Sequence, residues 1–453
     1  MYSNYMTIFR PRTTVLFLGD ICFFAFSLWF SLFVRAFEPP TWSLFEAHLA
    51  PFSLLFVVWV IVFFIAGLYE SRFIILARRA ISDTLLIAQT INVVIAALFF
   101  FFVPIYGIAP KTLLFIYLVI SFLFILFWRA FLFPLLGLQK ADNTILVGKS
   151  VEVDELVQAL KSAPHAPARI VAQIDPGTAA LSAVVLGAVE QCAPRFIIAD
   201  FSDARVSSAL SGLYNYLLQG IRFFDAGELY EDVFGRVPLP QVTETWLARN
   251  ISLYAHTGYD VLKRLVDVTI ALVGGTLSLV FYPCIILAIK LDDGGPIFVG
   301  LERVGKAGKV IHIYKFRSMN GNDGGNYGPG GSTKLTVTKV GKFLRRARLD
   351  ELPQFWNMLK GDLSFIGPRP ETPALVAVYE KEIPFYGVRH LIKPGLSGSA
   401  QLYYHADPHG TTDVSATKMK LSYDLFYLKH RSLTLDLSIT IKTIRRILMR
   451  TNA

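Results

Sequence analysis

The sequence predicts an integral membrane protein of three parts. These are a four-helix transmembrane bundle in residues 1–138, a Rossmann-like α/β domain in 139–250, and an α-rich monotopic domain in 251–453 that contains a re-entrant membrane helix. The composition is 53% hydrophobic and only 17% charged, whereas a soluble chain of this length usually carries more charge. The apolar residues are concentrated in long blocks. Between two of these blocks, short apolar runs alternate with helical patterns, which is typical of α/β domains.

Four apolar runs in the first part are long enough to cross a membrane, because a helix needs about 20 apolar residues to span a hydrocarbon layer of about 30 Å. The runs cover residues 13–34, 49–69, 84–110 and 112–128. The first run contains a carboxylate, Asp20. An ionisable group inside a span is a functional candidate by default. Asp20 lies near one end of its run, so we favour a hydrated carboxylate or one paired with a neighbouring helix.

The Lys and Arg residues predict the orientation, because short cytoplasmic loops carry an excess of both. The side that includes the N-terminus carries Arg10, Arg12, Arg72, Arg78, Arg79 and Lys140. The opposite side carries only Arg35 and Lys111. We therefore expect the N-terminus, and the whole chain after the fourth crossing, to be cytoplasmic.

The net charge of +10 restricts the choice of partners. Basic chains can bind nucleic acid, but here the Lys and Arg residues lie beside apolar segments. That arrangement favours an anionic membrane surface and phosphorylated substrates, and we expect no nucleic-acid partner. The three cysteines, Cys22, Cys192 and Cys284, lack the spacing of a disulfide framework or a zinc site.

The pattern changes near residue 141 and predicts the α/β domain. Strands are expected at 143–148, 169–175, 196–200 and 221–224, with helices at 153–160 and 204–218. Alternating strands and helices indicate a parallel, doubly wound sheet. The turn after the first strand, residues 147–150, has one glycine where the dinucleotide fingerprint has three. A structural or regulatory domain is therefore favoured over a cofactor site.

A fifth apolar run covers residues 265–289 and is predicted to form the re-entrant helix, 265–290. Basic residues flank it at both ends, namely Lys263, Arg264 and Lys290. Pro283 removes a hydrogen bond from the helix and kinks it. The freed backbone groups need a partner at the membrane, such as Ser278 or water. We therefore expect the helix to enter and leave on the cytoplasmic face; the alternative is an ordinary fifth span.

Two adjacent carboxylates, Asp350 and Glu351, are the candidate chemical centre. Such a pair beside arginines is often only a solvated helix face. A carboxylate that attacks a diphosphate must overcome the repulsion between two anions, so a cation has to cancel part of the charge. Carboxylates are the usual protein ligands of Mg²⁺, one or two at a time beside substrate oxygens. We therefore expect Mg²⁺ as the cofactor.

Basic residues beside glycine and proline turns supply candidate phosphate ligands. They are Lys315 and Arg317 in Lys-Phe-Arg-Ser-Met, Arg345 before the carboxylates, and Arg369 in Gly-Pro-Arg-Pro. Backbone amides in such turns can point at an anion, and the planar guanidinium group matches phosphate oxygens. Several such groups around two carboxylates suggest a diphosphate substrate.

These motifs resemble the bacterial sugar transferase family of polyprenyl-phosphate hexose-1-phosphate transferases over residues 260–450. The blocks that carry the resemblance are Glu302-Arg-Val-Gly305, Lys315-Phe-Arg-Ser-Met319, Leu349-Asp-Glu-Leu-Pro353, Lys360-Gly-Asp-Leu-Ser364, Gly367-Pro-Arg-Pro370 and Lys393-Pro-Gly395. The resemblance implies that Asp350 is the nucleophile and that Glu351 helps it to hold Mg²⁺. It also implies that Arg345 and Arg369 contact phosphate, and that Pro283 breaks the re-entrant helix of a catalytic domain.

The resemblance further implies an activity and a location. A member transfers a hexose-1-phosphate from a UDP-sugar to undecaprenyl phosphate and releases UMP, through a covalent phosphosugar-Asp intermediate. The arrangement of spans, α/β domain and catalytic domain resembles long members in the bacterial inner membrane that begin exopolysaccharide, capsule or O-antigen synthesis. Glucose or galactose is the expected sugar. The alternatives are a transferase that moves only the sugar and releases UDP, and a non-catalytic scaffold of polysaccharide assembly.

The sequence departs from the family pattern at two places, and the second leaves the choice of donor sugar open. Leu301 stands where the family often has Gln, and Lys334-Leu-Thr336 replaces an Asp-Pro-Arg-Ile-Thr stretch after a glycine-rich loop at 320–333.

Two apolar stripes at helical spacing are candidates for contact with the membrane or with another protein surface. The first, Leu352, Phe355, Trp356 and Leu359, either lies at the membrane or packs in a core. The second, Leu437, Ile441, Ile444 and Leu448, indicates a membrane-surface helix or a dimer contact. The α/β domain is another candidate surface for a homodimer.

Overall fold

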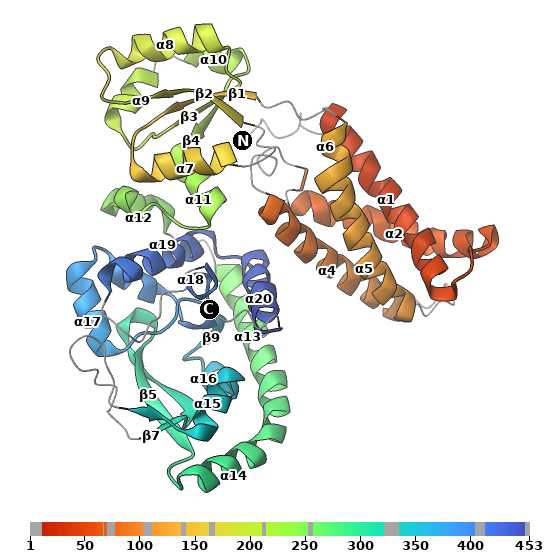
Figure 1. The fold of residues 1–453 in the computed structure, drawn as a ribbon, viewed down its shortest axis with the longest axis vertical. Helices are drawn as coiled ribbons and strands as arrows, with labels where there is room; N and C mark the ends of the chain where they lie inside the picture. The colour runs from red at the N-terminus through yellow and green to blue at the C-terminus, as the bar shows by residue number, and fades with distance from the viewer. Residues whose placement is uncertain are drawn as a thin grey trace. The chain divides into compact units, whose positions relative to one another are not determined.

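The structure is a computed structural model with two compact units, Met1–Val233 and Phe234–Ala453 (Figure 1). It describes residues 11–66, 68–69, 78–102, 111–136, 142–162, 168–210, 214–251, 257–320, 335–403 and 413–448. The predicted glycine-rich loop lies outside these residues, apart from Asn320. Each unit is described by itself.

The first unit begins with long apolar helices. They are α1 (Pro11–Ala36), α2 (Trp42–Ile65), α4 (Arg78–Phe102) and α5 (Lys111–Phe127), and α5 continues through a π-helical turn, η3 (Trp128–Leu132), into α6 (Phe133–Leu135). Three of them contain stretches long and apolar enough to cross a membrane, Thr14–Ala36, Trp42–Phe64 and Thr112–Leu132. The first, second and fourth predicted runs are therefore confirmed as apolar helices of spanning length.

The third predicted run, 84–110, differs from the prediction. Helix α4 begins with Arg78 and Arg79 and contains Asp83, so its apolar stretch within the described residues is only Ala88–Phe102. Residues 103–110 lie outside the described part of the chain. Two side chains of α4 that are buried, Gln89 and Asn92, hydrogen-bond to each other.

A buried ion pair links α1 to η3. Arg129 Nε donates to Asp20 Oδ1 at 3.0 Å, and Arg129 Nη2 also bonds to Asp20 Oδ2. Tyr69 donates its hydroxyl to Asp20 at 2.8 Å, and Arg129 Nη1 donates to the carbonyl of Leu68 at 2.9 Å. Asp20 is fully buried. This confirms the expectation that Asp20 pairs with a neighbouring helix, because an uncompensated charge is costly inside a bundle.

The α/β domain contains a four-stranded parallel sheet with strand order β2-β1-β3-β4. Its strands are β1 (Asp142–Val147), β2 (Ala168–Ile174), β3 (Phe196–Ala199) and β4 (Arg222–Asp225), and its helices are α7 (Val151–Ser162), α8 (Leu181–Cys192), α9 (Ala204–Leu210), α10 (Tyr214–Leu218) and α11 (Ala226–Phe234). Figure 1 shows α7 and α8 on opposite sides of the sheet. The predicted parallel sheet, with its four strands, is confirmed. In the turn after β1, Lys149 Nζ pairs with Asp175 at 2.6 Å.

The segment that we assigned to the end of the α/β domain lies in the second compact unit. Residues 234–250, which the sequence assigned to that domain, include η5 (Leu239–Gln241) and α12 (Glu244–Asn250). In this segment, Val237 is completely buried, and its N–H donates to the carbonyl of Ser422 at 3.1 Å. Leu239 and Trp246 pack into the same core. The apolar side chains of this segment therefore complete the second unit.

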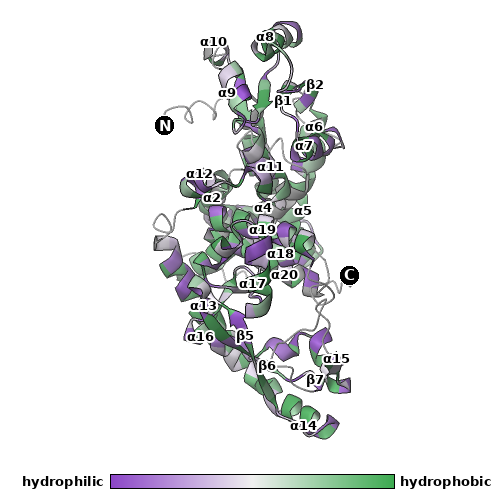
Figure 2. Ribbon diagram, turned by 90° about the vertical axis from the view of Figure 1, so that its left-hand side faces the viewer, coloured by the Kyte–Doolittle hydropathy of each residue, from purple (hydrophilic) through white to green (hydrophobic). Residues whose placement is uncertain are grey.

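A long broken helix follows α12 in the second unit. Helix α13 (Thr257–Ser278) is followed by one 3-10 turn, η7 (Leu279–Phe281), and then by α14 (Tyr282–Asp292). The chain changes direction there (Figure 1), and Figure 2 shows α14 as mostly hydrophobic. Pro283 occupies the first turn of α14, where the missing N–H costs little. Ser278 donates its hydroxyl to the carbonyl of Gly275 at 2.6 Å, so it satisfies a backbone group at the break.

The rest of the second unit is mainly helical, with three small two-stranded sheets that the sequence did not predict. Strands β5 (Phe298–Val304) and β6 (Val310–Phe316) form an antiparallel hairpin around η8 (Lys306–Gly308), β7 (Met319–Asn320) pairs with β8 (Thr336–Val337), and β9 (Ser364–Ile366) pairs in parallel with β10 (Gly395–Ser397). The helices are α15 (Lys339–Arg346), η10 (Leu349–Glu351), α16 (Gln354–Lys360), α17 (Pro373–Glu382), η11 (Tyr386–Leu391), α18 (Ser399–Tyr403), α19 (Val414–His430) and α20 (Leu433–Leu448).

Candidate active site

The two carboxylates lie in a short 3-10 turn between α15 and α16. Arg348 precedes this turn with a left-handed backbone, at φ 58° and ψ 18°. For a residue with a side chain this conformation costs roughly 1–2 kcal/mol. The reversal buries Asp350, which is 7% exposed. Backbone strain of this kind tends to occur at functional sites.

Asp350 is a buried carboxylate with a free oxygen. Its Oδ1 has no hydrogen-bond partner among the described residues. Burial raises the pKa of Asp350 above its ordinary value, and the charge of Glu351 adds to this effect, while Lys315, Arg345 and Arg348 partly oppose it. An unsatisfied buried carboxylate is destabilising and is therefore a strong candidate for a reactive group or a metal ligand.

Glu351 has the opposite environment. Lys315 Nζ donates to its Oε1 at 2.9 Å, and Arg348 Nη1 lies 3.5 Å from the same atom. Burial alone would raise the pKa of Glu351, but the charges of Lys315, Arg369 and Arg348 outweigh burial, so the pKa is lowered. Adjacent carboxyl groups with pKa values shifted in opposite directions suit different chemical roles.

The structure brings three of the four predicted phosphate ligands to the carboxylates. Lys315 contacts Glu351 directly. Arg369 is close enough for its charge to lower the pKa of Glu351, and the charge of Arg345 acts on Asp350 in the same way. The site therefore has an excess of positive charge around Glu351, whose pKa is lowered, and Asp350, whose Oδ1 is unpaired among the described residues. Such an excess of positive charge suits a polyanionic ligand.

Arg317, the fourth candidate, has a different partner. Its guanidinium group pairs with Asp293 in the loop before β5, and it lies so close to Gly295 that a Cβ at that glycine would overlap it. An ion pair with a nearby carboxylate stabilises this conformation. The structure therefore gives Arg317 a role in fixing the loop between α14 and β5.

Asn357 fixes α16 against the strand that carries Lys315. Its side chain is completely buried. Its Oδ1 accepts from the N–H of Tyr314 at 3.0 Å, and its Nδ2 donates to the carbonyl of His312 at 2.7 Å. Asn357 therefore bonds to backbone groups of β6 as a neighbouring strand would. These bonds hold the start of α16, next to the carboxylates, at a fixed distance from Lys315.

The turn that carries Arg369 is packed backbone against backbone. Gly367 N donates to Ser397 O at 2.8 Å, and Gly395 N donates to Pro368 O at 2.9 Å. A Cβ at Gly367 would lie 2.7 Å from the carbonyl oxygen of Lys393, and a Cβ at Gly395 would overlap Gly367. Glycine is therefore required for this close approach.

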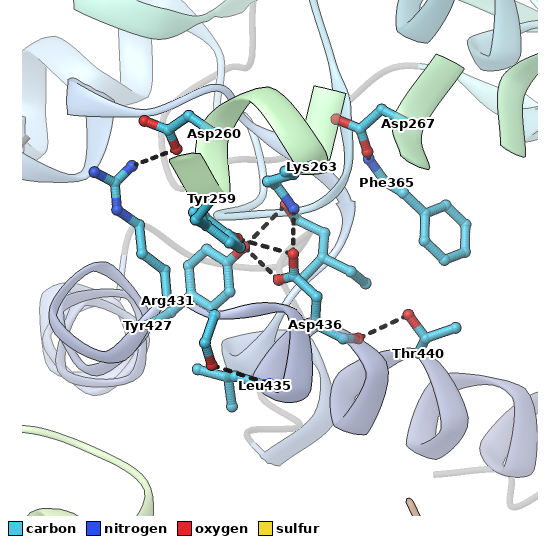
Figure 3. Close-up of polar contacts among 12 residues, drawn as sticks. Tyr259, Asp260, Lys263, Asp267, Phe365, Tyr427, Arg431, Leu435, Asp436 and Thr440 are labelled. Atoms are coloured by element: carbon cyan, nitrogen blue, oxygen red, sulfur yellow. Dashed lines mark hydrogen bonds and ion pairs between the residues drawn. The ribbon is translucent and has the colours of Figure 1, made fainter. Parts of the chain in front are cut away.

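Side chains from two helices, α13 and α19, contact strand β9, which leads into that turn, and Asp436 of α20 links those two helices (Figure 3). Asp267 of α13 accepts from the N–H of Phe365 at 2.9 Å. Tyr427 of α19 donates its hydroxyl to Asp436 of α20 at 2.7 Å, and the same hydroxyl lies 3.3 Å from the carbonyl oxygen of Ile366. Asp436 also accepts from Tyr259 and Lys263 of α13, each at 2.8 Å. The start of the long helix is thus bonded to the strand that positions Arg369.

Comparison with known proteins supports the family suggested by the motifs. The family model for bacterial sugar transferases matches residues 258–450. The UDP-N-acetylgalactosamine-undecaprenyl-phosphate N-acetylgalactosaminephosphotransferase of Aeromonas hydrophila is 38% identical over 58% of this chain and 60% of its own length. The UDP-glucose:undecaprenyl-phosphate glucose-1-phosphate transferase of Caulobacter vibrioides is 36% identical over 43% of this chain and 72% of its own length.

The chain belongs to the bacterial sugar transferase family. The exopolysaccharide production protein PSS of Rhizobium leguminosarum is also similar, at 35% identity over 41% of this chain and 94% of that protein. This chain spans 60% of the Aeromonas relative and 34% of a glucose-1-phosphate transferase from Xanthomonas campestris. The family match agrees with the region that the motifs predicted and includes all the candidate site residues.

Within this family fold, the first apolar stripe packs largely in the core of the second unit. Phe355 packs against α13, where a Cβ at Gly274 would lie 2.8 Å from its Cζ, and Leu359 joins the same core. Trp356 is 65% exposed. On α20, Leu437 and Ile441 are half-buried and Ile444 is exposed, while the side chain of Leu448 lies outside the described part.

Sequence reasoning missed Arg389, which contacts the turn of Arg369. Its Nη2 donates to the carbonyl of Arg369 at 2.9 Å. The only local signal is one arginine among Gly, Val, His, Leu and Ile in 387–392, since a cation in an apolar segment is expected to have a specific partner.

Replacing Gly395 by Ala is expected to destabilise this sugar transferase by about 1–3 kcal/mol, because the new methyl group overpacks two backbone segments. Thermal unfolding of the full chain would measure the change. Gly258→Ala is the matched control, because a Cβ there would meet no other described residue within 4 Å outside its own helical turn. Equal melting temperatures for the two variants would show that the close approach does not constrain the turn.

Proposed function

We propose that this sugar transferase moves a sugar-1-phosphate from a UDP-sugar to undecaprenyl phosphate and releases UMP. The observation that supports this most directly is the unpartnered Oδ1 of Asp350 beside an ionised Glu351 that Lys315 holds. The relatives named above act on UDP-glucose or UDP-N-acetylgalactosamine with undecaprenyl phosphate as acceptor, by their names. The product would begin the assembly of an exopolysaccharide, capsule or O-antigen.

The proposed reaction has two displacements at one phosphorus atom. The Asp350 carboxylate attacks the phosphorus that bears the sugar, and the bond from that phosphorus to the bridging oxygen of UMP breaks. UMP leaves with that electron pair, and a sugar-phosphate remains as an acyl phosphate on Asp350. An oxygen of undecaprenyl phosphate then attacks the same phosphorus and displaces the carboxylate. A covalent intermediate predicts ping-pong kinetics.

The surrounding cations have separate tasks in this proposal. Arg345 and Arg369 neutralise the diphosphate, which lowers the barrier to attack by an anion. Lys315 keeps Glu351 charged and oriented through the 2.9 Å contact. Positioning and electrostatic stabilisation account for most of the catalysis in phosphoryl transfer.

The carboxylates also fit the Mg²⁺ that the sequence led us to expect. The described residues contain no cluster of three or more metal-ligating side chains, but Mg²⁺ commonly binds through one or two carboxylates and substrate phosphates. The unsatisfied Oδ1 of Asp350 and the adjacent Glu351 would hold it. When bound, Mg²⁺ would neutralise charge on the diphosphate.

We also propose the membrane arrangement. The stretch Gly258–Asp292 is apolar enough to cross a membrane, and it exposes Leu265, Leu277, Val280 and Leu287. A break beside Pro283, with basic residues at both ends, favours a helix that re-enters the cytoplasmic face of the bacterial inner membrane. The N-terminus and the catalytic unit would then both be cytoplasmic, where nucleotide sugars are available.

The activity can be tested with the purified full chain, undecaprenyl phosphate, Mg²⁺ and a panel of UDP-glucose, UDP-galactose and UDP-N-acetylgalactosamine. We expect UMP to be released with at least one donor, in an amount equal to the lipid-linked product. Release of UDP would indicate transfer of the sugar alone and would contradict the proposal.

The acidic limb of the pH–rate profile is expected to reflect Asp350, which must lose its proton to attack. Because burial raises its pKa, kcat/KM should begin to fall at a higher pH than for an ordinary aspartate. Lys315→Met removes a charge that opposes this shift, so it should move the limb to still higher pH. Lys342→Met on the exposed side of α15 is the control. A profile that is the same for both variants would refute the assignment.

A further inference from the structure

Arg389 is a buried cation with partners on three segments. It is 5% exposed and lies in η11. Its Nη2 lies 2.7 Å from Oδ2 of Asp424 on α19, its Nη1 donates to the hydroxyl of Tyr386 at 2.6 Å, and Nη2 also donates to the carbonyl of Arg369. Asp424 is 1% exposed. The ion pair is therefore almost completely shielded from solvent.

Net stabilisation of the fold does not by itself explain why an ion pair is buried at this position. Removing two charges from water costs several kcal/mol per ion, and apolar residues of similar volume are often equally stable. A guanidinium group differs from an apolar side chain in holding several acceptors at fixed angles. The carbonyl of Arg369 is the acceptor in this network that belongs to the active site.

Arg389 completes a set of contacts along the turn that carries Arg369. Backbone groups fix Gly367 and Pro368, as described above, and Val304 N donates to Glu371 O at 2.9 Å. Arg369 lies between these fixed points, and the residue after it is a proline without an N–H. Arg389 fixes its carbonyl and so restricts the direction of the Arg369 side chain.

We propose that Arg389, held by Asp424, is a positioning residue that aims Arg369 at the diphosphate of the donor. The proposal rests on the proposed function in its choice of ligand. Arg389 itself is buried behind the turn and acts through Arg369.

Arg389→Lys keeps the charge but loses the planar fork, so it is the informative variant. We expect its Kd for UDP, measured by calorimetry on the full chain with Mg²⁺, to rise about tenfold, as for the loss of a hydrogen bond to a charged group. Asp424→Asn should weaken UDP binding in the same direction. Arg431→Lys is the matched control, because Arg431 is also buried and pairs with an aspartate, Asp260, at 3.2 Å. It should leave the Kd for UDP unchanged.

A double-mutant cycle separates positioning from a general structural effect. If Arg389 acts through Arg369, Arg389→Lys should weaken UDP binding in the wild-type background but have almost no further effect with Arg369→Gln. Independent, multiplicative losses would overturn the proposal, as would an unchanged Kd for a folded Arg389→Lys or Asp424→Asn variant. If Arg389→Lys does not fold, the same cycle with Asp424→Asn decides.

The binding readout distinguishes this inference from the proposed function. If the wild type binds UDP but releases no UMP from any donor, the proposed function fails while the positioning role is still tested. If UMP is released, KM for the donor should rise more than kcat falls in Arg389→Lys.

Discussion

Asp350→Asn is expected to lower the rate of UMP release by about a thousandfold or more, because the amide cannot replace a carboxylate nucleophile and the displacement has no alternative route. Single-turnover measurement of UMP with a saturating UDP-sugar gives the rate. Intact-mass measurement of the donor-treated protein should show a sugar-phosphate adduct on the wild type and none on the variant.

Asp362→Asn is the control for this prediction, because Asp362 is a nearby carboxylate that pairs with Lys360 at 3.2 Å and has no assigned role in the reaction. A comparable rate for Asp350→Asn and Asp362→Asn would rule out Asp350 as the nucleophile.

Asp350→Asn is not expected to lower the thermal stability of the protein, although it lowers the rate. A carboxyl group with a raised folded-state pKa stabilises the fold only below that pKa, and the contribution is lost as the pH rises through it. At neutral pH, the neutral Asn should therefore not lower the melting temperature.

Asp20→Asn is expected to destabilise the helical bundle by about 3–5 kcal/mol, because it leaves the buried guanidinium group of Arg129 without its counter-charge. The substitution preserves the shape of the side chain, so the loss measures charge rather than packing. Thermal or denaturant unfolding of the full chain in detergent, followed at the aromatic residues of the bundle, would give the change.

The exposed pair between Arg205 and Asp203, at 2.6 Å, provides the comparison. Arg205→Gln should cost at most about 1 kcal/mol, as surface pairs usually do. Replacing both buried partners, Asp20→Leu with Arg129→Met, should recover most of the stability lost in Asp20→Asn. If Asp20→Asn cost no more than Arg205→Gln, the buried pair would not be a significant contributor to the bundle.

Local patterns predicted the elements whose causes are local. The strands of the α/β domain are short apolar runs between turns, and the structure contains all four near the expected residues. The position of the segment after those strands depends on where Val237 is buried. Its hydrogen-bond partner, Ser422, is 185 residues away, and no local pattern carries that information. Helix α4 differed because its polar first turns shorten the apolar stretch.

The residues of the candidate site also divide into those with a local sequence signal and those whose role depends on distant contacts. Asp350 and Glu351 were found because they are adjacent and lie within a specific motif. Lys315 was found as a basic residue in a motif, although its partner, Glu351, is 36 residues away. Arg317 had equal sequence support, but a nearby aspartate, Asp293, binds it in the folded chain. Arg389 carried no motif at all, since its importance arises only from a contact with Arg369 that forms on folding.

The hydrogen bond between Asp267 and the N–H of Phe365 joins α13, which we propose to contact lipid, to the strand that leads into the turn of Arg369. A tilt of α13 in a thicker or thinner bilayer would be transmitted through this bond to Arg369, four residues further along the chain. In the membrane arrangement that we propose, lipid composition would thereby affect the binding of the UDP-sugar, before any acceptor lipid binds.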